Sequence, residues 1–221
     1  METFEERLTA VRDRMARAAE RAKRDPADIL LLAVTKVFPP EVIREAYDAG
    51  LRDFGENYVQ ELETKAPAVA DLAEARFHLI GHLQSNKSKK AAELFHTIQT
   101  VDSAKLARRL DEIGKPLDVM LEVKLSHEEA KSGVAPEVLP ELVAAVLSCG
   151  NLTLRGLMTV PPWSDNPEAA RPIFRALREL ADTHGLAGLS MGMSHDLETA
   201  IEEGSTCVRV GTALFGKRKK E

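Results

Sequence analysis

The chain has 221 residues, of which 44% are hydrophobic and only 5% aromatic, and its formal net charge at pH 7 is −5. This size predicts one domain spanning residues 1–221 with a largely aliphatic core, and the acidic balance gives no reason to expect a nucleic-acid partner. The first 25 residues contain no apolar leader, and no apolar stretch approaches the roughly 20 residues of a membrane span, so we expect a cytoplasmic protein without a membrane partner.

The predicted elements begin with a helix over residues 2–24, which we expect to pack on the rest of the chain. After it, short apolar runs typical of buried strands alternate with amphipathic segments typical of helices. The predicted strands are 29–35, 52–55, 77–81, 97–101, 118–123, 154–160, 189–193 and 207–211. The predicted helices are 40–49, 57–73, 85–95, 103–113, 136–148, 167–184 and 195–203, and residues 217–221 are expected to form a frayed basic tail.

This strict alternation favours parallel strands joined by right-handed crossovers. The first strand runs into Thr35-Lys36-Val37-Phe38-Pro39-Pro40, which lacks the glycine-rich fingerprint of an open dinucleotide-binding sheet. Eight units therefore predict a single α/β domain, a closed (β/α)8 TIM barrel with an extra amino-terminal helix. Functional residues of such barrels lie at the carboxyl ends of the strands.

Lys36 stands at the carboxyl end of the first predicted strand. Partial removal from water favours the neutral form of an amine, which is the form that attacks a carbonyl carbon. The alternative is a solvated lysine at a strand end. Further polar residues follow other predicted strands, and these are Glu56, Asn57, His78, Gln84 to Lys87, Thr159, Ser194, Arg209 and Thr212.

The last two predicted strands carry an anion-binding pattern. Ser194 precedes a helix start, and Gly211-Thr212 ends the eighth strand with a glycine that lets backbone N–H groups approach a ligand. The loops after strands 7 and 8 are the usual phosphate site of such barrels. An amine and a phosphate site at one barrel mouth together suggest a phosphate ligand that carries an aldehyde, such as pyridoxal 5'-phosphate (PLP).

Several ordered motifs match one family. They are LAVTK (32–36), FGENY (54–58), HLIG (78–81), LQSNK (83–87), KSG (131–133), RGLM (155–158), LSMGMS (189–194) and VRVGT (208–212). Over about residues 30–216 the chain resembles the PLP homeostasis proteins, which are similar to the amino-terminal barrel domain of alanine racemase.

The resemblance implies that Lys36 holds PLP as an internal aldimine. It also implies that Arg209 faces the pyridine nitrogen, that the phosphate is bound by Ser194, Gly211 and Thr212, and that the pocket is lined by Asn57 and Met158. A guanidinium only donates hydrogen bonds, so it leaves the pyridine nitrogen unprotonated and the ring a weaker electron sink.

The two tyrosines, Tyr47 and Tyr58, offer no evident acid/base partner on the face opposite Lys36. The resemblance therefore implies a monomeric carrier of PLP that acts in PLP, vitamin B6 and amino-acid homeostasis without efficient catalysis, with PLP-dependent apoenzymes as recipients. The alternatives are an amino-acid racemase of the alanine racemase type and a sugar-phosphate aldolase that uses Lys36.

The histidines give no metal prediction. His78 and His82 have a spacing of four, but the residues between them are strand-like and no third ligand is evident, so we expect no metal site. His195 is expected to be a surface residue in the first turn of a helix.

Overall fold

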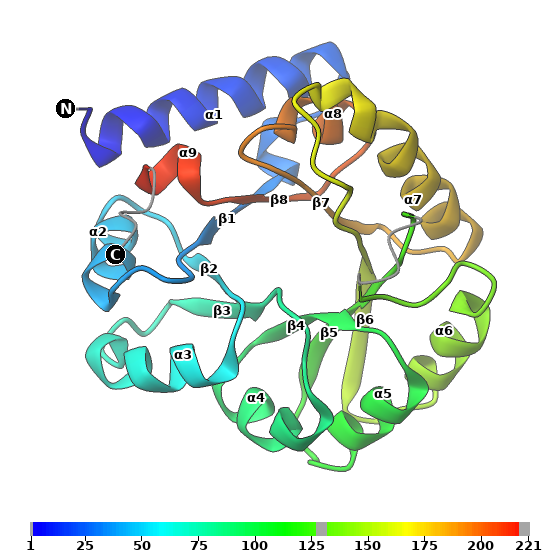
Figure 1. Cartoon of the computed structure of the whole chain (residues 1–221). Coiled ribbons are helices and arrows are strands. Elements are labelled where there is room, and N and C mark those ends of the chain that lie inside the picture. Colours follow the sequence, from blue (N-terminus) through cyan, green and yellow to red (C-terminus); the bar gives the residue numbers. More distant parts are fainter. Residues whose placement is uncertain (1, 127–131, 217–221) are drawn as a thin grey trace.

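The computed structural model describes residues 2–126 and 132–216, and in these ranges eight parallel strands close into a barrel in chain order (Figure 1). The strands are β1 (Leu30–Val34), β2 (Asp53–Glu56), β3 (Arg76–Leu79), β4 (Thr97–Val101), β5 (Leu117–Glu122), β6 (Leu152–Met158), β7 (Gly188–Met193) and β8 (Cys207–Val210). The predicted (β/α)8 barrel is confirmed. The predicted tail at 217–221 and Lys131 lie outside the described residues.

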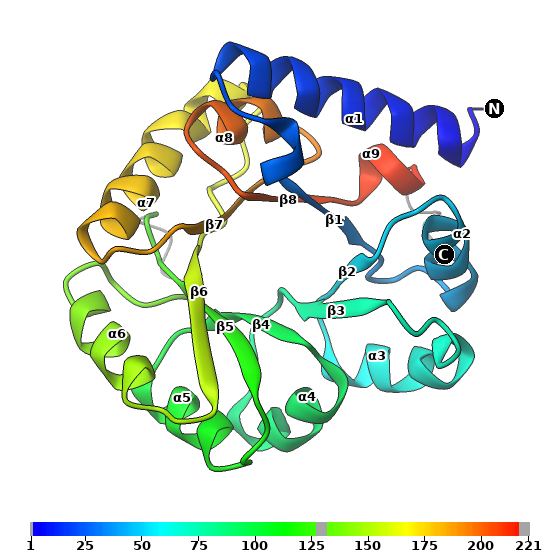
Figure 2. The same ribbon diagram turned by 180° about the vertical axis from the view of Figure 1, so that it is seen from behind.

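The α-helices of the described residues surround the ring of strands (Figures 1 and 2). They are α1 (Phe4–Arg21), α2 (Pro40–Asp48), α3 (Val59–Lys65), α4 (Ser88–Leu94), α5 (Ala104–Asp111), α6 (Leu139–Leu147), α7 (Arg171–Thr183), α8 (Leu197–Glu202) and α9 (Thr212–Phe215). Helix α9 was not predicted, because four residues are too few to show a helical period.

Helix α1 is the extra amino-terminal helix, and it lies across α8 and α9 on the outside of the barrel (Figure 1). Its amino terminus is closed by a capping box between Thr3 and Glu6, a feature that stabilises a helix by about 1 kcal/mol. Arg14 makes a two-point ion pair with Glu198 of α8, with N–O distances of 2.6 and 2.7 Å. Helix α1 therefore contacts the outer helices of the barrel through both packing and an ion pair.

The strand register decides which side chains enter the barrel. Leu32 of β1 is paired with Arg209 of β8, and Met158 of β6 is paired with both Glu122 of β5 and Ser190 of β7. Paired residues of parallel strands point to the same side of a sheet, so each of these sets shares one face. Since Arg209 and Ser190 are buried and hydrogen-bonded to each other, that face is the interior of the barrel.

Close contact between β6 and β7 requires glycine. A Cβ atom at Gly156 would lie 1.9 Å from the carbonyl oxygen of Gly188, and Gly156 has a φ of 156°. A side chain cannot be placed there without moving the backbone. The register of β6 shifts at this point, next to the residues that lead to Met158.

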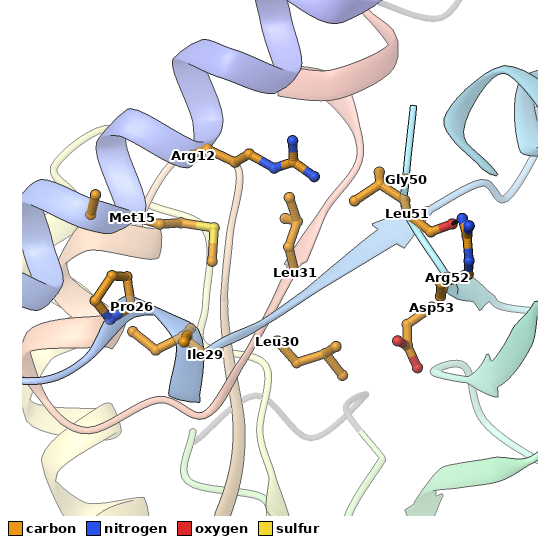
Figure 3. Close-up of a pocket in the computed structure, with 12 residues that line it drawn as sticks. Arg12, Met15, Pro26, Ile29, Leu30, Leu31, Gly50, Leu51, Arg52 and Asp53 are labelled. Atoms are coloured by element: carbon orange, nitrogen blue, oxygen red, sulfur yellow. Dashed lines mark hydrogen bonds between the residues drawn. The ribbon is translucent and has the colours of Figure 1, made fainter. Parts of the chain in front are cut away.

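A groove of about 590 Å³ lies outside the barrel, between α1 and the start of β1 and β2 (Figure 3). Its walls include Arg12 on α1 and Arg52 before β2, with Leu30 and Leu31 between them. It lies away from the carboxyl ends of the strands and therefore apart from the predicted site.

Among the described helices, none combines the length and the apolar character that would let it cross a membrane.

Candidate functional site

Lys36 lies two residues beyond the end of β1, after Thr35, and is half-buried. The next residue, Val37, has a φ of 61°, which is rare and strained for a β-branched side chain. Two side chains of α3 hold the backbone on either side of Lys36. Glu61 accepts a hydrogen bond from the Val37 N–H, and Lys65 Nζ donates to the Thr35 carbonyl at 3.0 Å. Helix α3 therefore fixes the direction in which the Lys36 side chain leaves the strand.

A buried ion-pair cluster lies behind this segment, between β1, β2 and α3. Lys65 Nζ is 2.8 Å from Glu56 Oε1 and 2.6 Å from Glu61 Oε1, and Thr35 Oγ1 donates to the same Glu56 oxygen at 2.7 Å. Burial raises the pKa of Glu56, while Lys65 and Thr35 oppose the shift. Glu56 was expected at the barrel mouth, but it points outward to α3, because neighbouring strand residues face opposite sides. No sequence pattern indicates that Lys65 is the partner of Glu56.

The predicted phosphate site is assembled where β7 and β8 end. Ser194 Oγ accepts hydrogen bonds from the backbone N–H groups of Gly211 at 3.3 Å and Ala213 at 3.2 Å. A Cβ atom at Gly211 would lie 3.4 Å from the carbonyl oxygen of Val34, so this loop adjoins the strand that carries Lys36. Thr212 is exposed between the two N–H donors. Converging N–H and hydroxyl groups are the donors that phosphate oxygens accept, so the set fits a phosphate ester. The sequence did not single out Ala213.

Arg209 is buried inside the barrel, 4% exposed. Its Nη1 donates to Ser190 Oγ at 2.7 Å, and its Nη2 donates to the Thr159 carbonyl at 2.8 Å. Burial lowers the pKa of Arg209, although Asp196 is among the groups that raise it. A guanidinium remains charged under these conditions, so the site contains a permanent donor.

Asn57 and Met158 lie at the same end of the barrel. Met158 is buried on the inner face, and Asn57 follows β2 and is half-buried. The turn after β3 crosses directly over Asn57, since a Cβ atom at Gly81 would lie 2.3 Å from the Asn57 carbonyl oxygen. Only glycine permits this approach without a backbone shift. All seven residues predicted to bind the ligand therefore occupy the carboxyl ends of β1, β2, β6, β7 and β8.

Glu122 is a residue that the sequence did not single out. It ends β5, across the ring from β1, and its Oε2 atom is buried without a hydrogen-bond partner. Burial raises the pKa of Glu122, and Asp102 adds to the shift, while Arg209 and His82 oppose it. A buried carboxyl oxygen without a hydrogen-bond partner costs free energy, so it calls for an explanation such as a ligand that it contacts. The sequence signal that could have identified Glu122 is a glutamate at an inward-facing position of an otherwise apolar strand.

The raised pKa of Glu122 predicts a pH dependence of stability. The folded chain binds this proton more tightly than the unfolded chain, so the contribution is complete below the ordinary value of 4.5 and is lost as pH rises through the folded pKa. We expect Glu122→Gln to gain stability relative to the parent as pH increases from about 4 to 7. Urea unfolding at several pH values measures this. Exposed Glu141→Gln is the control, and equal pH profiles of parent and Glu122→Gln would contradict the prediction.

The histidines occupy separate environments. His78 is inside the barrel, with Nε2 2.8 Å from Asp53 Oδ1, whereas His82 is exposed with Nδ1 3.5 Å from Asp102 Oδ2. Among the described residues, no group of three or more metal-ligating side chains is brought together. His195 is exposed and its ring lies 5.0 Å from that of Trp163, as expected of a surface residue.

Comparison with known proteins gives a consistent result. Residues 7–219 match the profile described as alanine racemase, N-terminal domain. The chain is 50% identical to the "Pyridoxal phosphate homeostasis protein" of Pseudomonas aeruginosa, covering 99% of this chain and 97% of that protein. It is 44% identical to the protein of the same name from Escherichia coli strain K12, covering 96% and 95%.

Solved structures agree with these relatives. PipY of Synechococcus elongatus with PLP bound has 38% identity and a TM-score of 0.83, covering 97% of this chain and 100% of that one. Without PLP, PipY has 39% identity and a TM-score of 0.86 over the same shares. Alanine racemase of Corynebacterium glutamicum, at 19% identity and a TM-score of 0.68, covers 96% of this chain and 61% of its own, and shows the shared fold alone.

Proposed function

This chain belongs to the pyridoxal phosphate homeostasis protein family, and from that premise we propose that it binds PLP and acts in PLP, vitamin B6 and amino-acid homeostasis. The observation that carries the proposal is that the donors around Ser194 adjoin the end of β1, the strand that leads into Lys36, at one barrel mouth. A PLP-bound relative of the same fold supports it. In this proposal the protein works in the cytoplasm as a monomeric carrier and supplies PLP-dependent apoenzymes.

We assign the chemical roles by donor and acceptor type. The Lys36 amine would hold PLP through its aldehyde carbon, with the aldehyde oxygen leaving as water. The phosphate would accept hydrogen bonds from the hydroxyls of Ser194 and Thr212 and from the N–H groups of Gly211 and Ala213, which donate to Ser194 Oγ in this structure and would turn to the phosphate when it binds. Arg209 would donate to the pyridine nitrogen, and Asn57 and Met158 would form the remaining walls of the pocket. Bound PLP supplies an electrophilic aldehyde and an electron-withdrawing ring.

The same residues support a carrier rather than an efficient enzyme. Arg209 cannot give up a proton, so the pyridine nitrogen that it faces stays unprotonated and withdraws electrons weakly. The two tyrosines are placed elsewhere: Tyr47 lies under the Arg52 guanidinium at 4.0 Å, and Tyr58 is 60% exposed at the start of α3. The proposal therefore assigns neither tyrosine to a second proton transfer.

Borohydride reduction of the PLP-loaded protein, followed by peptide mapping, tests the linkage. We expect the pyridoxyl group on Lys36 in the peptide that spans β1, and on no other lysine in stoichiometric amount. An adduct at another lysine, or none, would reject the assignment. Racemisation of alanine at about 1 per second or faster would favour the enzyme alternative instead. Trapping of a phosphosugar but not of PLP would favour an aldolase.

Ser194→Ala should weaken PLP binding roughly tenfold, because a hydroxyl hydrogen bond to a charged phosphate contributes about 1.5 kcal/mol. Titration of PLP against the visible absorbance band measures the dissociation constant. Ser164→Ala, in the loop after β6, is a matched control. Equal affinities of Ser194→Ala and parent would remove Ser194 from the phosphate site.

A further inference from the structure

A single file of hydrogen bonds crosses the interior of the barrel beneath the mouth. Asp53 Oδ1 lies 2.8 Å from His78 Nε2, and His78 Nδ1 lies 3.2 Å from Gln99 Nε2. Ser190 Oγ donates to Gln99 Oε1 at 2.6 Å and accepts from Arg209 Nη1 at 2.7 Å. These side chains come from β2, β3, β4, β7 and β8, so the file joins distant strands of the ring.

The two ends of the file fix its direction. Arg209 can only donate, so Ser190 Oγ must accept from it and turn its own hydrogen to Gln99 Oε1. An ionised Asp53 can only accept, so His78 Nε2 carries a hydrogen, and in the neutral ring Nδ1 is then free to accept from Gln99 Nε2. Both ends require the same orientation of the Gln99 amide. Every hydrogen in the file therefore points from Arg209 toward Asp53.

The file also accounts for how a buried charge is tolerated. The two hydrogen bonds of Arg209 go to neutral oxygens, those of Ser190 and Thr159. Asp196 and Glu122 act on it through space, and burial raises the pKa of both carboxyls. Aligned dipoles that end on a carboxylate stabilise a buried cation without direct contact between the charges.

Asp53 lies at the opposite opening of the barrel from the mouth. It lines a cavity of about 290 Å³ together with His78, Gln99, its neighbour Arg76 and a second charged pair, Arg155 and Asp118. Arg76 Nε is 3.9 Å from Asp53 Oδ1, and Arg155 Nε is 3.0 Å from Asp118 Oδ1. The file therefore connects a half-buried carboxylate at the amino-terminal opening to a guanidinium at the site.

We propose that four residues position Arg209 through this file and couple the proposed site to the charge at the amino-terminal opening: Asp53, His78, Gln99 and Ser190. The inference rests on the proposed function, in which Arg209 faces the pyridine nitrogen. The four residues do not touch PLP in this scheme. They set how strongly the guanidinium donates to the ring, and so they set the electronic state of the ring.

The test compares two substitutions that remove the same charge from the same opening. Asp53→Asn lies in the file, and Asp118→Asn lies outside it. We expect Asp53→Asn to weaken PLP binding roughly three- to tenfold and to shift the wavelength of the visible band of bound PLP. Asp118→Asn should change the affinity less than about twofold and leave the wavelength unchanged. A wavelength shift separates positioning of Arg209 from a general loss of stability.

A double-mutant cycle tests whether the effect travels through the file. Gln99→Leu interrupts it in the middle, so Asp53→Asn should have no further effect on the wavelength in that background. Thr97→Val, two residues earlier on β4, is the control, because it removes a polar group inside the barrel without interrupting the file. In that background Asp53→Asn should shift the wavelength as much as it does in the parent. Additive shifts in the double variant would overturn the coupling.

The outcomes separate the two proposals. A parent protein without a band that depends on Lys36 would reject the proposed function and this inference with it. A normal band in the parent, with Asp53→Asn and Asp118→Asn indistinguishable in affinity and wavelength, would reject the inference alone.

Discussion

Replacement of Lys36 by alanine is expected to abolish the visible absorbance band of the PLP-loaded protein. The substitution removes the amine that holds the aldehyde, while the phosphate donors around Ser194 stay in place. The remaining non-covalent affinity should be lower by roughly two orders of magnitude, or about 2.7 kcal/mol. The dissociation constant can be measured by titration of PLP followed by quenching of Trp163 fluorescence, and the band by absorbance.

The fold should tolerate this change. Lys36 is half-buried at a strand end, and its backbone is held by Glu61 and Lys65 whatever side chain it carries, so the free energy of unfolding should fall by about 0.5 kcal/mol or less. Lys87→Ala is the matched control, since this lysine lines a cavity with Asn57 at the same end of the barrel. A persistent band in Lys36→Ala, or its loss in Lys87→Ala, would contradict the assignment.

Among single replacements of a lysine by methionine in the described residues, Lys65→Met should lower the free energy of unfolding the most. The Lys65 side chain is 7% exposed, and Glu56, its partner at 2.8 Å, is fully buried. Removing one member of a buried ion pair leaves the other charge without compensation, which costs about 3–5 kcal/mol. The Thr35 carbonyl also loses one of its two donors and keeps only the Phe38 N–H, so the segment that carries Lys36 should loosen and PLP affinity should fall.

Two comparisons isolate the cause. Lys90→Met removes a half-exposed lysine that pairs with Glu63 and Glu93, and it should change the free energy of unfolding far less than Lys65→Met does. Adding Glu56→Leu to Lys65→Met removes the stranded charge and should restore much of the stability in urea unfolding. If Lys65→Met and Lys90→Met unfold at the same urea concentration, the buried pair is not the stabilising feature described here.

The sequence by itself determined the architecture and the location of the site at the carboxyl ends of the strands. The hydrophobic period of each segment indicates whether it is a strand or a helix. Regular alternation of the two leaves few topologies other than a parallel barrel. Parallel strands bring their carboxyl ends to one side, so Lys36, Ser194 and Arg209 could be placed together without coordinates. Short motifs then identified the family.

Tertiary structure alone decided how these residues are held. Glu56 meets Lys65 from a neighbouring helix, and Gln99 meets Ser190 from across the barrel, at separations that no local period encodes. Strand alternation shows only that a side chain faces in or out; barrel closure and register decide which inward groups meet. The partners of Arg209 and the orphan oxygen of Glu122 are therefore properties of the closed ring.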